Sequence, residues 1–86
     1  MSAELLEFPC EFPLKIMGRK TTGFRETVLS LVEPHTGTIA ATQVRERDSR
    51  DGNFVALTLV VHAQSQAQLD AIYTALSAHD QVLMVL

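Results

Sequence analysis

The sequence is poor in the residues from which several kinds of site are built. Among 86 residues there is one cysteine, one tyrosine and no tryptophan. The lone Cys10 has no partner for an internal disulfide, which fits a reducing compartment. The three histidines come without a second cysteine or clustered carboxylates, so no metal site is expected. Neither GxxxxGKS/T nor GxGxxG occurs, which excludes the usual nucleotide-phosphate loops, and no cofactor is expected.

Long apolar runs and excess positive charge are also missing. The most apolar stretch, 54–61, contains Thr58 and is far shorter than a bilayer requires. The first four residues lack the basic and then apolar order of a secretory signal, so we expect a cytoplasmic protein. The net charge of −3 argues against general affinity for nucleic acid or anionic membranes. An apolar content of 47% fits one small globular domain.

What the chain does have is an apolar periodicity that changes between two and 3.6. It predicts four strands, at 12–18, 38–47, 54–62 and 81–86. Helices are expected to begin near Thr22 and after Ser65. The resulting order β-α-β-β-α-β indicates a ferredoxin-like α+β fold, in which two helices cover one face of a four-stranded antiparallel sheet. We expect one domain over 12–86, preceded by an extended lead-in at 1–11.

Short-range signals place the ends of these elements. Thr21 or Thr22 is the expected N-cap of the first helix, and Pro34 is expected to end it near Val32, because proline removes a helical hydrogen bond. Asp51-Gly52 predicts the hairpin turn. Ser65 with Gln68 three residues later forms a capping box for the second helix. The expected buried stripes are Phe24, Val28, Leu31 and Val32, then Val55, Leu57, Leu59 and Val61, then Leu69, Ile72, Tyr73 and Leu76.

The expected topology brings three connections to one pole: the loop 18–22, the hairpin 48–52 and the loop at 79–80. The N-terminus of the first helix lies there too and offers a mild anion site. Six basic residues map to this pole or beside it, namely Arg19, Lys20, Arg25, Arg45, Arg47 and Arg50. Acidic residues interleave with them, so a solvated charged rim and a site for an anion or an acidic partner are both open.

The face of the sheet away from the helices is the second candidate surface. Residues expected there are unusually apolar: Met17, Ala40, Thr42, Val44, Phe54, Ala56, Val60, Leu83 and Val85. A monomer seldom exposes so apolar a face, so either the lead-in residues 5–8 or a second copy of the chain is expected to cover it. Small residues and flanking charges are the third possibility. Phe54, Val60 and Val85 are the contact residues we select, and a homodimer is one expected outcome.

One enzyme family shares this element order. The segment from Gly18 to Arg25 resembles the phosphate loop of acylphosphatases, and Val44-Arg45 is also similar to that family. Asp51-Gly52 follows in the hairpin as part of the same likeness. The resemblance implies that Arg25 binds phosphoryl oxygens by bidentate hydrogen bonds. The loop is shorter than in that family, and Glu46 stands where the family carries its catalytic asparagine. A carboxylate there repels an anionic substrate, so hydrolysis is the least favoured alternative.

A closer resemblance spans nearly the whole chain. The start Phe8-Pro9-Cys10-Glu11-Phe12-Pro13 and the end Met84-Val85-Leu86, with Gly52-Asn53-Phe54 and Gln68-Leu69-Asp70-Ala71-Ile72-Tyr73 between them, resemble the YbeD family of small bacterial proteins. The resemblance implies a ferredoxin-like fold similar to ACT regulatory domains, with no established activity. Members are often encoded beside a lipoate-synthesis octanoyltransferase, which implies a protein partner linked to lipoate metabolism. ACT domains hold ligands at the position of Gly18 and the loop Arg19–Gly23.

Three functions follow from the sequence. The first is a non-enzymatic cytoplasmic module that regulates or binds another protein through the open face or the loop pole. The second is an ACT-like sensor that binds a small ligand at a subunit interface. The third is the acylphosphatase-like hydrolase. The site candidates are Gly18, Arg19, Lys20, Gly23, Arg25 and Arg45 for a ligand or partner, with no catalytic residue assigned.

Overall fold

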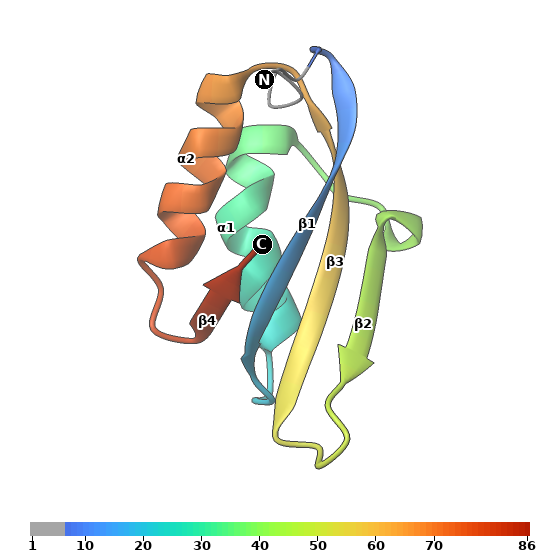
Figure 1. Cartoon of the computed structure of the whole chain (residues 1–86), viewed down its shortest axis with the longest axis vertical. Helices are drawn as coiled ribbons and strands as arrows, with labels where there is room; N and C mark the ends of the chain where they lie inside the picture. The colour runs from blue at the N-terminus through green and yellow to red at the C-terminus, as the bar shows by residue number, and fades with distance from the viewer. Residues whose placement is uncertain (1–6) are drawn as a thin grey trace.

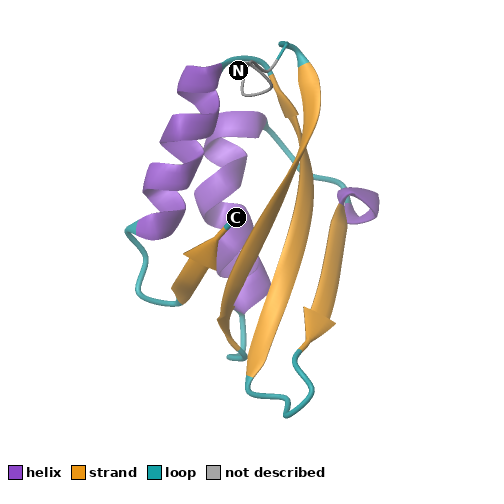
Figure 2. Ribbon diagram, in the orientation of Figure 1, coloured by secondary structure: helices purple, strands orange, loops and turns teal. Residues whose placement is uncertain are grey.

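Two helices lie against one face of a four-stranded antiparallel sheet, and the other face carries neither helix (Figures 1 and 2). The structure is a computed structural model and describes residues 7–86. The ferredoxin-like prediction is confirmed. In chain order the elements are β1 Cys10–Arg19, α1 Phe24–Thr36, the 3₁₀ turn η1 Ala41–Gln43, β2 Val44–Asp48, β3 Phe54–Ala63, α2 Gln66–Ser77 and β4 Val82–Val85.

The strands lie in the order β2-β3-β1-β4, so the two long strands β1 and β3 form the centre of the sheet. They pair over their whole lengths, from Cys10 opposite Ala63 to Arg19 opposite Phe54. Because side chains alternate between the two faces of a strand, this register determines, for each residue of β1 and β3, whether its side chain lies on the helix side or on the opposite side of the sheet. The helix side receives the buried residues, and the other side is the open face.

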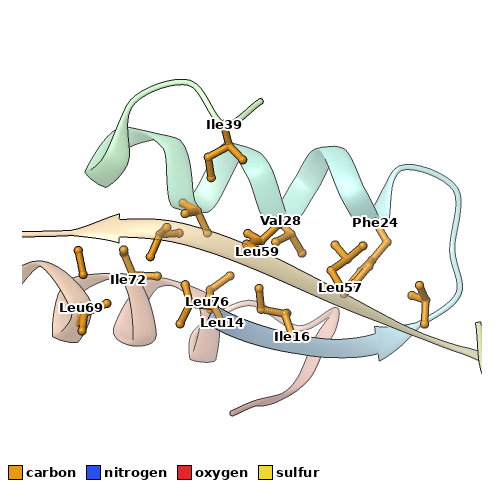
Figure 3. Close-up of a cluster of buried hydrophobic side chains, with 14 residues drawn as sticks. Leu14, Ile16, Phe24, Val28, Ile39, Leu57, Leu59, Leu69, Ile72 and Leu76 are labelled. Carbon is orange, nitrogen blue, oxygen red and sulfur yellow. The ribbon is translucent and has the colours of Figure 1, made fainter. Parts of the chain in front are cut away.

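The core fills the space between the helices and the sheet (Figure 3). The predicted stripe on β3 is confirmed, since Val55, Leu57, Leu59 and Val61 are all buried. Leu69, Ile72 and Leu76 of α2 are buried as expected, whereas Tyr73 is half-buried at the edge of the cluster. Partial burial raises the pKa of the Tyr73 hydroxyl above 10.0, because the tyrosinate anion loses hydration there.

The first helix differs from its prediction at both ends. Its N-cap is Gly23, in the left-handed region at φ 85°, rather than Thr21 or Thr22, and no side chain caps it. The helix also continues through Pro34 to Thr36. Pro34 and Ser30, which lies one turn before it, are both exposed. The Ser30 carbonyl, which proline leaves without a helical hydrogen bond, can therefore face water. Gly37, at φ 83°, then closes the helix by donating its N–H to the Glu33 carbonyl at 2.8 Å.

The second strand is also shorter than predicted. Residues 38–43 form a connection and the turn η1 instead of extending β2, which starts at Val44. The Gln43 side chain explains the turn, because its amide donates to the Val60 carbonyl at 2.9 Å and its oxygen accepts from the Ala40 N–H at 2.9 Å. β1 starts at Cys10, two residues earlier than expected, and β3 ends one residue later, at Ala63.

Two turn signals behave as the sequence suggests. Gly52 has φ 78° in the β2–β3 hairpin, a conformation that glycine adopts without strain. Ser65 caps α2 by accepting the Gln68 N–H at 3.1 Å. The reciprocal half of the predicted capping box is shifted by one residue, because the Gln68 side chain accepts from the Gln64 N–H rather than from Ser65.

The apolar lead-in does not cover the open face where the structure describes it. Phe8 packs against the buried cluster between helices and sheet, together with Cys10 and Phe12. Leu5 and Leu6, the other residues expected to cover the open face, lie outside the described residues. Among residues 7–86, the open face is therefore exposed to solvent.

Candidate functional site

The predicted pole exists: the β1–α1 loop, the β2–β3 hairpin and the α2–β4 loop lie at the lower end of the molecule in Figure 1. Two of its cations are paired with carboxylates. The Lys20 ammonium binds Asp48, and the Arg25 guanidinium lies 3.4 Å from the Glu46 carboxylate. These exposed pairs add little stability, but they compensate the positive charge that an anion would need. The pole is thus closer to a solvated, self-paired rim than to an anion site.

The loop backbone at this pole is engaged as well. Lys20 donates its N–H to the Asn53 carbonyl at 2.9 Å, and Phe24 donates to the Thr21 carbonyl at 3.2 Å. A phosphate loop needs such N–H groups to point at the ligand. In the loop that resembles that of acylphosphatases, two N–H groups are therefore already hydrogen-bonded to carbonyls of the protein.

Gly18 has a packing role that accounts for its missing side chain. A Cβ atom built on it meets the Gln81 carbonyl oxygen and the Phe24 ring at distances well under 3.0 Å. The ring of Phe24, which is buried, therefore fills the space beside the backbone of β1. The ACT resemblance would place a ligand beside Gly18, and here the protein's own aromatic ring takes that space.

The open face has a composition that the pole lacks. It consists of alternate residues of β1 and β3, together with Arg45 and Arg47 of β2 and the residues of the C-terminal strand that pair with β1. These residues are Glu11, Pro13, Lys15, Met17, Arg19, Arg45, Arg47, Phe54, Ala56, Thr58, Val60, His62, Met84 and Leu86. Among residues 7–86, Glu11 is the sole acidic side chain on this face, and it lies 3.0 Å from the His62 ring at one end.

The register of β2 separates its charges by sign. Glu46 lies opposite Leu57 and Asp48 opposite Val55, so both acids share the face of these buried residues. There they meet Arg25 and Lys20. Arg45 and Arg47 lie opposite Thr58 and Ala56 and project from the open face. The alternation Arg-Glu-Arg-Asp thus places the cations of β2 on one side of the sheet and its acids on the other.

A groove runs along β3 on this open face. Two adjoining hollows, of about 540 and 370 Å³, share Arg47 and Ala56 in their linings. Small residues of β3, Ala56 and Thr58, form the floor, and the longer side chains of β1 and β2 form the walls. We call this the β3 groove and define it by Lys15, Met17, Arg45, Arg47, Ala56 and Thr58, with Arg50 and Phe54 at one end.

An apolar patch lies beside the groove, on the β4 side of β1. Met84 is opposite Met17, and Leu86 exchanges backbone hydrogen bonds with Lys15 at 2.8 and 3.2 Å. Leu83 is the extra residue of a bulge in β4. The three are among the most exposed large apolar side chains of the described chain, at 52% for Leu83, 50% for Met84 and 61% for Leu86. This apolar patch, Met17, Leu83, Met84 and Leu86, adjoins the β3 groove through Met17.

Four of the residues expected on the open face are not there. Ala40 and Thr42 lie in the connection and the turn η1 before β2, outside the sheet. Val85 lies opposite Ile16 and Val44 opposite Leu59, so both face the core, against which they pack half-buried. The bulge in β4 shifts its register, which the sequence pattern does not reveal. Phe54 and Val60 do lie on the open face. Phe54 is 37% exposed, and the Arg19 guanidinium lies over its ring, 5.9 Å from the centroid.

The hairpin at the end of the groove is ordered by its own side chains. The Asp51 carboxylate accepts from the Asn53 N–H at 3.0 Å and from the Ser49 hydroxyl at 2.7 Å. These bonds favour the charged form and lower the pKa of Asp51 below 3.8. The turn that carries Arg50 is therefore held by a carboxylate that is ionised at neutral pH.

The histidines and carboxylates of residues 7–86 are dispersed rather than clustered. No three His, Cys, Asp or Glu side chains gather there into a group able to hold a metal ion. His79 accepts the Gln81 N–H at 3.2 Å, and His62 pairs with Glu11 at the other end of the sheet. In the same range, no helix has the length and apolar character needed to cross a membrane.

Comparison with known proteins places this chain in a family. The family model described as "Protein of unknown function (DUF493)" matches residues 3–86. The chain belongs to the DUF493 family. The UPF0250 protein of Nitrosomonas europaea is 43% identical over 82 residues, which are 95% of this chain and 94% of that protein. The UPF0250 protein of Chromobacterium violaceum is 48% identical over 83 residues, or 96% and 93% of the two chains. The predicted YbeD family membership is confirmed.

A solved structure supports the fold of this DUF493 protein. The solution structure of protein HP0495 from H. pylori superposes with a TM-score of 0.68 and covers 95% of this chain and 86% of that one. At 15% identity, the likeness concerns the fold alone. The family consists of small bacterial proteins of unknown function, so the comparisons assign no activity to the groove or the pole.

The structure thus brings the sequence candidates together differently from the prediction. Lys20, Gly23 and Arg25 share the pole, Arg45 and Arg47 lie on the open face, and Arg19 reaches over Phe54 at its edge. Sequence reasoning missed Lys15, which lines the β3 groove opposite Arg45 across Thr58. The period of two on the first strand was the available signal, since it puts Lys15 and Met17 on the same face.

Proposed function

We propose that this protein is a docking module that binds another protein through the open face of its sheet and carries out no catalysis itself. The observation that carries the proposal is the combination on one face of exposed apolar side chains and cations that form no ion pair within residues 7–86. Large exposed apolar patches that adjoin charged residues are typical of protein interaction sites. Under this proposal, the protein regulates its partner by recruiting it or by blocking its binding to other molecules.

The pole formed by the three loops supports the two alternative functions less well than the open face supports docking. Lys20 and Arg25 are paired with Asp48 and Glu46, and the Phe24 ring occupies the space beside Gly18. A phosphoryl site or a small-ligand site at this place needs those cations or that space to be free. The open face has exposed surface and cations that form no ion pair with any residue from 7 to 86.

The charge of the open face also favours a different protein over a second copy. In a symmetric dimer with the two open faces stacked, both copies would contribute Lys15, Arg45 and Arg47 to one interface. Like charges brought together in this way cost binding free energy. We therefore propose a heterologous partner, and a lipoate-related protein remains the partner class that the family resemblance implies.

Affinity capture from native lysate tests the proposal. Val60→Asp places a carboxylate on the open face, and Met84→Glu does so at an exposed position that tolerates it in the fold. Ala67→Asp, on the exposed side of α2, is the matched control that adds the same charge elsewhere. We expect wild type and Ala67→Asp to retain a stoichiometric protein that both open-face variants lose at least tenfold. Equal recovery by all four proteins, each folded by circular dichroism, would refute docking through this face.

A further inference from the structure

The β3 groove has the shape and charge to hold an extended chain. Its floor is made of the small residues Ala56 and Thr58, and its walls carry Lys15 on one side and Arg45 and Arg47 on the other. All three cations are exposed, and none forms an ion pair or side-chain hydrogen bond with a residue from 7 to 86. Charges in such a groove are available to an incoming partner.

We infer that the β3 groove receives an acidic segment of the partner protein in extended conformation, with carboxylates at alternate positions that pair with Arg45 and Arg47. The inference rests on the proposed docking function and specifies what is docked. Arg45 and Arg47 are two residues apart on a strand, which separates them by roughly 6.8 Å along it. Alternate side chains of an extended segment have the same spacing, so two carboxylates meet two guanidinium groups without adjustment.

Acidic groups near the groove do not cancel this charge. Glu46 and Asp48 line the edges of the two hollows, but their carboxylates bind Arg25 and Lys20 on the helix side. Glu11, the acidic residue of the open face, is held by His62 beyond Val60, away from the groove. The apolar patch beside Met17 adds a surface for apolar residues of the same segment, and methionine adapts its shape readily.

A protein segment fits this surface better than a nucleic acid does. Single-stranded nucleic acid is usually held by several aromatic side chains on which bases stack. On the open face of residues 7–86, Phe54 is the sole Phe, Tyr or Trp residue, Arg19 lies over its ring, and the His62 ring is paired with Glu11. A polyanion longer than the groove would also meet the acidic remainder of a chain with net charge −3. A short acidic segment avoids that repulsion.

Two synthetic peptides of equal composition test the inference by NMR titration of the labelled protein at low salt. One alternates Glu and Thr over eight residues, and the other has four Glu followed by four Thr. We expect the alternating peptide to shift the amides of β2 and of 56–58 and to bind more tightly than the blocked one. The Arg45→Ala, Arg47→Ala double variant should bind the alternating peptide about tenfold more weakly than wild type does. The control, Lys20→Ala with Arg25→Ala, removes the same charge at the pole and should weaken binding less than twofold.

Three results would overturn the inference. They are equal binding of the two peptides, equal weakening by the two double variants, and tighter binding of a thymidine oligonucleotide of the same charge in the same groove. The Arg45→Ala, Arg47→Ala double variant is also used in the affinity capture from lysate. This comparison distinguishes failure of the acidic-segment inference from failure of the docking proposal. Loss of the partner with Met84→Glu but not with the arginine pair leaves docking standing and refutes the acidic segment. Retention by every open-face variant refutes docking itself.

Discussion

Replacement of Gly18 by alanine is expected to lower the free energy of unfolding by about 2–3 kcal/mol, and Gly18→Val is expected not to fold. A Cβ atom at this position meets the Gln81 carbonyl and the buried Phe24 ring well under 3.0 Å away. The carbonyl belongs to the backbone and the ring is fixed in the core, so neither moves without cost. Urea denaturation of wild type and Gly18→Ala measures the difference.

A double variant separates this steric cause from a general intolerance of strand β1. Phe24→Leu removes the ring atoms nearest to the added Cβ, although the Gln81 carbonyl stays in place. Gly18→Ala should therefore cost at least about 1 kcal/mol less in the Phe24→Leu background than in wild type. Unchanged stability of Gly18→Ala in the wild-type background would show that the space beside Gly18 is free, as an ACT-like ligand site needs.

The second large effect contrasts two neighbours on β3. Leu59 is fully buried between the helices and the sheet, whereas Val60 is on the open face. Leu59→Ala is expected to cost about 3 kcal/mol, because it removes buried methyl groups and leaves a cavity. Val60→Ala should cost less than about 1 kcal/mol, since water already reaches its side chain. For a domain of this size the first change corresponds to a fall in Tm of roughly 12–24 °C.

Thermal denaturation of the two variants side by side measures this contrast. The two residues are neighbours on one strand and lie on its opposite faces, and Leu→Ala removes only one carbon atom more than Val→Ala, so a large difference between the variants reports which face is covered. Similar losses of stability at 59 and 60 would mean that something packs on the open face in the isolated protein, which conflicts with a free docking surface.

Much of the fold was predictable because its signals are local. The alternation on β3, the Asp51-Gly52 turn and the Ser65 cap each follow from the properties of a few adjacent residues, and all three are found. Pro34 was misleading because proline fixes φ at a helical value and loses one bond only, which an exposed carbonyl replaces with water. The prediction of a strand at residues 38–43 was wrong because the Gln43 side chain forms hydrogen bonds that favour a turn there.

The candidate site was less accessible to sequence reasoning, because it depends on register. A shift by one residue exchanges the two faces of a strand. The expected outward set, with Val44 and Val85, would have directed Arg45 and Arg47 toward the helix side. The observed pairing of Val44 with Leu59 reverses this and separates the cations of β2 from its acids. Nor did the sequence reveal that Lys20 and Arg25 find their own carboxylates at the pole.

The most direct test of docking through the open face is site-specific photo-crosslinking in living bacterial cells. Met84 and Thr74 are both exposed, the first on the open face and the second on the outer surface of α2. Each residue is replaced in turn by benzoylphenylalanine, and the cells that produce the variant are irradiated. We predict a discrete crosslinked protein from position 84 that is absent from position 74. Crosslinking from position 74 alone, or from neither position, would contradict the open face as the docking surface.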